Sequence, residues 1–211
     1  HAFGTMMDKN GKPFKTRSGG TVKLNDLLNE ATEKAFKLVL NKNPSLSKKE
    51  ASIISKKLGI GAVKYADLSK TRSNDYIFDW DSMLSFEGNT SPYLQYAYTR
   101  IYSIFEKTSF SSEDIEEDIE ISTNEERKLA LDLLCFNETL EQVAVQGYPH
   151  ILCSYLYNLA SSFMVFYEHC PILKEGVSPK IKMSRLMLSK TTSQILKKGL
   201  NLLGIEVMEK M

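Results

Sequence analysis

The sequence predicts a mainly α-helical protein whose larger part is a helical bundle. Apolar residues recur at three- and four-residue steps in several separate stretches, as they do on one face of an amphipathic helix. Most of these stretches are bounded by residues that start or stop helices, such as Ser, Asn, Gly and Pro. No internal repeat with a period of about 20 to 50 residues is visible, which argues against a solenoid. With 211 residues, 42% of them hydrophobic, the chain can bury one large core or two small ones.

The first 24 residues are expected to form loops and short strands. They are rich in Gly, Lys and Thr, and they contain turn signals at residues 9–11 and 18–20. Nothing before His1 supplies a start, so we expect the chain to be part of a longer protein.

Three helices are predicted next. The first covers residues 24–43 and stops at Pro44. The second covers residues 48–58 and is expected to end at Gly59, because Gly is a common C-terminal stop. A third covers residues 62–70. The following segment, residues 76–89, is aromatic and acidic, which is typical of a loop-rich connection.

The second half of the chain predicts the bundle. A helix begins at Ser91-Pro92, with Ser91 as N-cap and Pro92 at the first helical position, and continues to about residue 107. Residues 111–126 carry eight acidic side chains and no basic one, so we expect a solvated linker or an exposed helix face that repels phosphate. Further helices are predicted at about residues 124–146, 149–168 and 180–203, the last stopped by Gly204.

Composition excludes several classes of protein. Lys plus Arg number 27 and Asp plus Glu 26, so any nucleic-acid surface must arise from the placement of charges. The longest apolar runs, such as residues 163–167, are too short to span a bilayer, and no signal peptide opens the chain. We therefore expect a cytoplasmic protein with no membrane partner.

The cysteines and histidines predict neither disulfides nor a metal site. Cys135, Cys153 and Cys170 are odd in number and form no C-x-x-C pair, so buried free thiols are expected. His169 adjoins Cys170, but the remaining histidines, at positions 1 and 150, complete no ligand cluster at a usable spacing.

A basic, glycine-rich segment is the first candidate site. Between Lys9 and Lys23 there are five cations and no anion, and the glycines let backbone amides approach a ligand closely. Such a loop could clamp a polyphosphate and offset charge on a leaving group. It lacks the P-loop spacing. A solvated basic turn is the alternative interpretation.

An aromatic helix face is the second candidate. At about 100° per residue, Tyr93, Tyr96 and Arg100 fall on one face of the helix that starts at Ser91. Two rings and a guanidinium could bind unpaired RNA bases and a phosphate. By pattern alone, the favoured interpretation is that the rings merely border the apolar stripe of that helix. The aromatic residues at 155, 157, 163, 166 and 167 are interpreted as core.

Three long segments resemble arginyl-tRNA synthetase. They are KPFKTRSGGTVKLNDLLNEA (12–31), GIGAVKYADLSKTRSNDYIFDWDSMLSFEGNTSPYLQYAYTR (59–100) and SRLMLSKTTSQILKKGLNLLGIEVMEKM (184–211). The resemblance covers nearly the whole chain, in order. It implies a class I synthetase that uses ATP, with Mg²⁺, to activate arginine and then transfers the arginine to its tRNA.

The resemblance also assigns roles to residues. Class I sites pair a HIGH motif with a KMSKS motif, and the segment around residues 14–18 is similar to a degenerate KMSKS-type loop. The implied ATP-binding residues are Lys12, Lys15, Thr16, Arg17 and Ser18. The HIGH motif and the arginine pocket are expected upstream, so no catalytic residue is assigned in this chain and the chain alone is expected to be inactive.

For the second half, the resemblance implies a DALR-type anticodon-binding domain. It implies that a loop and a helix contact the anticodon stem and loop of tRNA(Arg), and that the chain's last residue lies close to the anticodon. The implied tRNA-binding residues are Phe86, Asn89, Tyr93, Tyr96, Arg100 and Met211.

The sequence therefore predicts two parts. Residues 1–90 are expected to be the end of a class I catalytic domain, and residues 91–211 the helical anticodon-binding domain of a monomeric enzyme. A freestanding RNA-binding module without a catalytic half is the alternative. A structural helical domain whose acidic stretch binds a protein partner is a third hypothesis.

Overall fold

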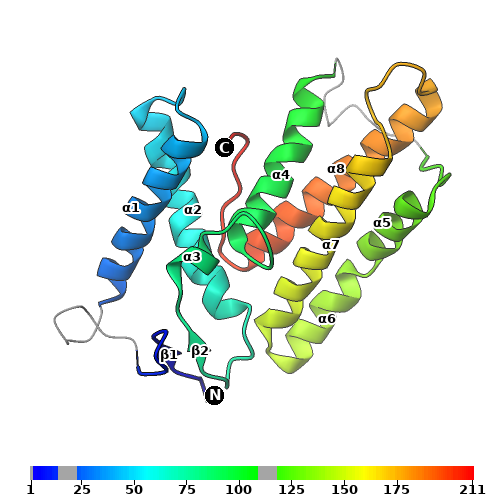
Figure 1. Cartoon of the computed structure of the whole chain (residues 1–211). Helices are drawn as coiled ribbons and strands as arrows, with labels where there is room; N and C mark the ends of the chain where they lie inside the picture. The colour runs from blue at the N-terminus through cyan, green and yellow to red at the C-terminus, as the bar shows by residue number, and fades with distance from the viewer. Residues whose placement is uncertain (1, 14–22, 109–117) are drawn as a thin grey trace.

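The computed structural model describes residues 2–13, 23–108 and 118–211, and in these ranges the protein is mainly helical (Figure 1). The predicted fold class is confirmed. The described elements, in chain order, are β1 (Met6–Met7), α1 (Leu24–Lys42), α2 (Lys48–Leu68), β2 (Tyr76–Ile77), α3 (Trp80–Met83), α4 (Ser91–Glu106), α5 (Asn124–Leu134), α6 (Phe136–Gln146), α7 (Pro149–His169) and α8 (Pro179–Leu202).

Helices α1 and α2 pack against each other along their length, and the predicted break at Gly59 is wrong. Helix α2 passes through Gly59 and Gly61 without interruption. A Cβ atom at Gly59 would lie 2.7 Å from the carbonyl carbon and oxygen of Ala31 on α1. A Cβ at Gly61 would lie 2.8 Å from Oγ of Ser91. The two glycines therefore lie inside the helix, where the lack of a side chain lets neighbouring segments pack closely, and they do not end it.

The two short strands bring the N-terminal residues next to the segment that follows α2. Strands β1 and β2 pair in parallel, with Met6 opposite Tyr76. This confirms the expected short strand near the N-terminus. Residues 14–22, which include most of the predicted polyphosphate loop, lie outside the described residues.

The bundle comprises α4 to α8, and its core is built mainly from α4, α5, α7 and α8. The single helix predicted for residues 124–146 is instead two helices that meet at Cys135. The N–H of Cys135 donates to the carbonyl of Asp132, three residues back, which tightens the last turn of α5. Across this junction Leu134 is exposed, whereas Phe136 is buried.

Two local predictions are corrected by side-chain contacts. The N-cap of α4 is Thr90 and not Ser91, because the Thr90 hydroxyl oxygen accepts the N–H of Tyr93 at 3.2 Å. The acidic stretch is not wholly solvated, since Glu126 is 1% exposed. Its carboxylate accepts a hydrogen bond from Nε of Arg185 on α8 at 2.7 Å. Residues 111–117 of the stretch lie outside the described residues.

The chain after α8 forms an extended segment, residues 204–211, which we call the C-terminal tail. Gly204 adopts a φ of +68°, a left-handed conformation that favours glycine, and this confirms the predicted stop. The tail then runs between α2 and α4 (Figure 1), with Ile205 and Met208 buried. Among the described residues, no helix is long and apolar enough to cross a membrane.

Candidate functional site

Helix α4 brings Tyr96 and Arg100 together, one turn apart. The guanidinium carbon of Arg100 lies 5.3 Å from the centre of the Tyr96 ring and 5.0 Å from that of Tyr167, on α7. A guanidinium at these distances from two aromatic rings is held by cation–π attraction. All three side chains are half-buried, so each keeps an accessible surface. Part of the second sequence-predicted site is therefore assembled as a stack of rings and charge.

The stack lines a cavity of about 650 Å³ between α4 and α7, which we call the α4–α7 cavity. Met211, at the end of the C-terminal tail, lines the same cavity. So do Lys107 and Lys174, whose ammonium groups add to the positive charge of Arg100, while Glu168 is an acidic residue in the lining. The cavity thus combines aromatic surface, an apolar thioether and cations, which suits a base and its phosphate.

Tyr93 is separated from the other two residues of its predicted face. Its ring packs on Tyr157 of α7, with the ring centres 5.6 Å apart, and its hydroxyl is 3.4 Å from Oγ of Ser161. Tyr93 is not part of the α4–α7 cavity lining. Tyr93 therefore contacts α7 at a different place from Tyr96 and Arg100, although the sequence predicts one shared face.

The loop before α4 brings Phe86 to the same region. The Phe86 ring meets Tyr96 edge to face, with centres 6.4 Å apart, and Nζ of Lys42 lies 4.5 Å from the centre of the Phe86 ring. The loop turns at Gly88, where φ is +77°. Phe86 thus extends the aromatic surface that begins at Tyr96.

Asn89 is exposed at the end of that loop, and its side chain is held by a hydrogen bond from the interior. Its Oδ1 accepts the hydroxyl of Tyr65 at 2.6 Å, and the same hydroxyl lies 2.9 Å from the carbonyl oxygen of Cys153. Burial raises the pKa of Tyr65, so the hydroxyl stays protonated as a donor. Tyr65 therefore ties the loop to both α2 and α7.

Sequence reasoning missed Tyr167 and Lys174 as site residues. Tyr167 was interpreted as core because it follows Phe163 and Phe166, which are indeed fully buried. Its neighbour on the other helix, Arg100, is 67 positions away, and no periodic pattern reports such a distance. The cavity lining is the observation that identifies these residues.

Of the predicted ATP-binding residues, only Lys12 is described. Lys15, Thr16, Arg17 and Ser18 lie outside the described residues. Lys12 is exposed, and its N–H donates to Oδ1 of Asp8 at 2.9 Å. This hydrogen bond lowers the pKa of the Asp8 carboxyl.

One cation of the basic segment already has an acidic partner. Nζ of Lys9 lies 2.9 Å from a carboxylate oxygen of Asp79. This ion pair links the N-terminal turn to the residue that caps α3.

The thiols and acidic groups form no metal centre in the described ranges, where no group of three or more His, Cys, Asp or Glu side chains could hold an ion. Cys153 and Cys170 are buried free thiols, as expected, but Cys135, at the junction of α5 and α6, is exposed. Burial raises the pKa of the Cys153 thiol to about 12, so it remains protonated.

Comparison with known proteins places this geometry in a family context. The model of the DALR anticodon binding domain matches residues 94–211, and the model of the class I (R) tRNA synthetase catalytic domain matches residues 1–80. The arginine–tRNA ligase of Saccharophagus degradans is 60% identical over the whole chain, and that of Histophilus somni is 58% identical over 99% of it. The chain spans 36% of the length of each of these relatives.

Solved structures agree with the sequence matches. The Thermus thermophilus arginyl-tRNA synthetase aligns over the whole chain with a TM-score of 0.87 and 31% identity, the chain covering 35% of that structure. The Plasmodium falciparum arginyl-tRNA synthetase aligns over 90% of the chain with a TM-score of 0.82 and 34% identity, with 34% of that structure covered. Because the family models and these relatives agree along its length, the chain belongs to the class I arginyl-tRNA synthetase family and carries that family's DALR anticodon binding domain.

Proposed function

We propose that this chain is the tRNA-binding portion of an arginine–tRNA ligase and that it reads the anticodon stem and loop of tRNA(Arg). The observation that carries the proposal is the α4–α7 cavity, where Arg100 is stacked between Tyr96 and Tyr167 next to Met211. Unpaired bases stack on aromatic rings, and a held guanidinium can contact a phosphate or a base edge.

The neighbouring predicted residues extend this surface. Phe86 adjoins Tyr96, so a second base could stack on it, and exposed Asn89 offers an amide for a base edge. Tyr93 packs on Tyr157 at the side of the cavity, and in this proposal its ring supports the RNA backbone from that side. These roles are supported by position and chemistry.

We also propose the division of labour along the chain. Residues 1–90 complete the catalytic domain, with Lys12, Lys15, Thr16, Arg17 and Ser18 on the phosphates of ATP, and residues 91–211 bind tRNA. Mg²⁺ would be held by the ATP phosphates, because the described residues offer no cluster of acidic ligands. The intact protein would join arginine to tRNA(Arg) as a cytoplasmic monomer, and this chain alone would not.

The test measures binding of tRNA(Arg) and of transcripts with single base changes. Changes in the anticodon loop should weaken binding, whereas changes in the distant duplex that keep its base pairs should not. Affinity should also fall as salt concentration rises, because binding releases counterions from the phosphates. Equal affinity for every tRNA would refute the anticodon-reading proposal.

The third hypothesis, a structural domain with a protein partner, predicts a different outcome. It rests on the acidic stretch as a surface for a partner. One residue of that stretch, Glu126, is instead buried in an ion pair with Arg185. Under that hypothesis, replacing Tyr96 and Arg100 by Ala would leave any tRNA binding unchanged.

A further inference from the structure

The C-terminal tail is held to α4 by two buried side chains. Nε2 of Gln95 donates to the carbonyl of Glu206 at 2.8 Å, and the Thr99 hydroxyl donates to the carbonyl of Met208 at 3.0 Å. Gln95 is fully buried and Thr99 is 8% exposed. Because water does not compete at buried positions, these hydrogen bonds fix the tail backbone more strictly than surface contacts could.

The residues that hold the tail adjoin those that line the cavity on α4, and Thr99 belongs to both groups. Gln95 and Thr99 are one turn apart, as are Tyr96 and Arg100, and each pair is displaced from the other by one residue, or about 100° around the helix. Helix α4 therefore presents two adjacent stripes. One stripe, Gln95 and Thr99, binds the tail, and the other, Tyr96 and Arg100, lines the α4–α7 cavity. Thr99 also lines the cavity.

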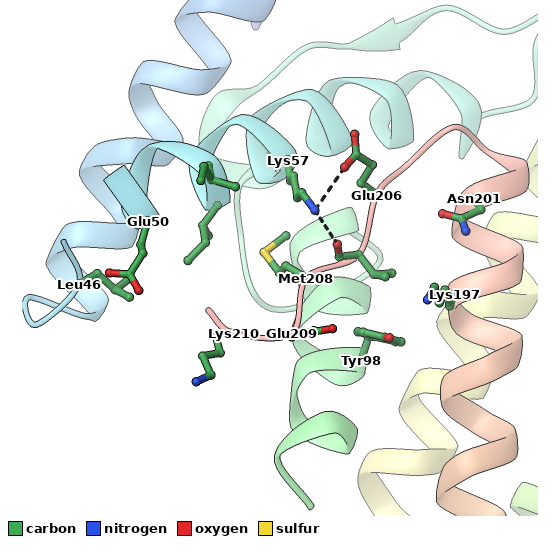
Figure 2. Close-up of a pocket in the computed structure, with 13 residues that line it drawn as sticks. Leu46, Glu50, Lys57, Tyr98, Lys197, Asn201, Glu206, Met208, Glu209 and Lys210 are labelled. Atoms are coloured by element: carbon green, nitrogen blue, oxygen red, sulfur yellow. Dashed lines mark hydrogen bonds and ion pairs between the residues drawn. The ribbon is translucent and has the colours of Figure 1, made fainter. Parts of the chain in front are cut away.

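Helix α2 holds the tail from the opposite side. Nζ of Lys57 donates to the carbonyl of Val207 at 3.3 Å and forms an ion pair with Glu206 at 3.2 Å (Figure 2). A pocket of about 540 Å³ lies beside the tail here, so the tail is not enclosed by packing along this edge. Hydrogen bonds to its backbone therefore help to set its course, together with the buried side chains of Ile205 and Met208.

We propose that Gln95 and Thr99 are positioning residues, which fix the tail so that Met211 lies in the α4–α7 cavity and completes the surface for a base. The inference rests on the proposed function, because it assumes that the cavity binds RNA. Gln95 does not line the cavity, whereas Thr99 does. In this inference the Thr99 hydroxyl acts through the tail backbone, to which it is hydrogen-bonded, and its effect reaches the ligand at Met211.

The experiment replaces Thr99 by Val in the intact protein and measures affinity for the anticodon stem-loop of tRNA(Arg). The change removes the hydrogen bond to Met208 and nearly preserves volume. Thr192→Val is the matched control, because Thr192 is also buried and its hydroxyl donates only to the carbonyl of Leu188 in its own helix. The single proton of the Thr99 hydroxyl is shared between the carbonyl of Gln95, in its own helix, and that of Met208, both 3.0 Å away, so the two variants differ in the contact to the tail.

We expect Thr99→Val to weaken binding by about 3- to 10-fold, the value of one net hydrogen bond, and Thr192→Val to leave affinity unchanged. Both should lower the melting temperature by similar amounts. Thr99→Ser, which keeps the hydroxyl, should restore affinity. Equal affinities for the two valine variants would overturn the inference.

A double-mutant cycle separates positioning from a general loss of stability. If Thr99 acts through the tail, Met211→Ala should weaken binding, and Thr99→Val should have no further effect in that background. Additive losses, or no loss with Met211→Ala, would contradict the inference. Should Thr99→Val fail to fold, Gln95→Met replaces it in the same cycle, since it removes the bond to Glu206 with little change in shape.

Failure of this inference differs from failure of the proposed function. If Tyr96→Ala weakens stem-loop binding and Thr99→Val does not, the tail inference alone is wrong. If neither variant changes the affinity, the cavity does not bind the anticodon and both proposals fail.

Discussion

Arg100 illustrates how single side chains set the properties of the cavity. Its guanidinium carbon lies 5.3 Å and 5.0 Å from the ring centres of Tyr96 and Tyr167, so cation–π attraction to both rings favours this position before any ligand arrives. Stacking of this kind depends on a planar, delocalised cation, which Lys cannot provide. A held side chain also loses less conformational entropy on binding than a free one.

Tyr96→Ala should weaken binding of the anticodon stem-loop by about 1–3 kcal/mol, the usual cost of losing one base-stacking ring. The variant also removes one of the two rings that hold Arg100. Fluorescence anisotropy with a labelled stem-loop measures the effect. Tyr148→Ala is the control, because Tyr148 is a half-buried tyrosine at the start of α7 that does not line the cavity. Similar losses in both variants would argue against a specific role for Tyr96.

Glu126 is the second residue whose environment matters. Burial alone would raise the pKa of its carboxyl, but the N–H of Ser122 and the guanidinium of Arg185 donate to the carboxylate and outweigh burial. The pKa is therefore lowered from its ordinary value of 4.5. Arg185 also donates to the carbonyl of Pro171, so the pair connects α5, α8 and the segment between α7 and α8.

The lowered pKa gives a sign for the pH dependence of stability. The contribution of Glu126 is fully present above about pH 4.5, the unfolded-state value, and is lost as pH falls through the lower pKa of the folded state. Glu126→Gln should reduce the free energy of unfolding near neutral pH by about 3–5 kcal/mol, because it leaves Arg185 buried without a counter-charge. It should also flatten the acid side of the stability profile, measured by urea unfolding.

A surface pair provides the control. Glu120 forms an exposed ion pair with Lys180 at 2.9 Å, and Glu120→Gln should cost less than about 1 kcal/mol. Equal effects at the two glutamates would show that burial of the Glu126 carboxylate is not the cause.

At the scale of elements, the close packing of α1 on α2 depends on glycine. Helix propensity favours Ala over Gly by about 1 kcal/mol inside a helix, so Gly59 reduces the intrinsic stability of α2. The reduction is offset because the backbone of α1 can approach where a Cβ atom would otherwise stand. Propensity and packing therefore favour opposite residues at this position.

Gly59→Ala should destabilise the protein by about 1–3 kcal/mol despite its better helix propensity, because the added methyl group would overlap the backbone of Ala31. Thermal unfolding followed by circular dichroism measures the change. Ser52→Ala, at an exposed position of α2, introduces the same residue without the overlap and should be neutral or slightly stabilising. A stabilised Gly59→Ala protein would mean that α1 can move away at no cost.

At the scale of the whole molecule, the net charge of +1 gives little overall attraction to RNA. The charges around the α4–α7 cavity matter more, since Lys107, Lys174 and Arg100 gather there. The match to the catalytic domain model is confined to residues 1–80, and the chain spans 36% of the length of its Saccharophagus degradans relative. We therefore expect this chain to bind tRNA without catalysis, and the intact protein to do both.

The isolated 211-residue chain should bind tRNA(Arg) but form no arginyl-tRNA when given arginine and ATP. The reason is that the chain spans 36% of its relatives' length and contains no HIGH motif. An aminoacylation assay with radiolabelled arginine, run in parallel on the intact protein, measures both activities. Product formed by the chain alone would contradict the assignment of its first 90 residues to an incomplete site. An intact protein that binds tRNA and forms no product would instead favour the freestanding RNA-binding module.

Sequence periodicity predicted most of the helices, because burial of one face imposes a 3.6-residue repeat on local sequence. It was wrong at Gly59 and Cys135 for different reasons. A glycine that ends a helix and one that lets a neighbouring helix approach have the same sequence signature. At Cys135 the apolar pattern continues through a bend, so periodicity alone gave one helix instead of two.

The sequence by itself determined the helical class, the family resemblance and the candidate residues on α4. Only the tertiary structure decided that Tyr96 and Arg100 share a cavity with Tyr167 and Met211, while Tyr93 packs apart from them. The physical reason is the range of the interactions. Helix periodicity arises from residues three or four apart, whereas the cavity arises from packing between segments far apart in the chain, whose contacts leave no local pattern.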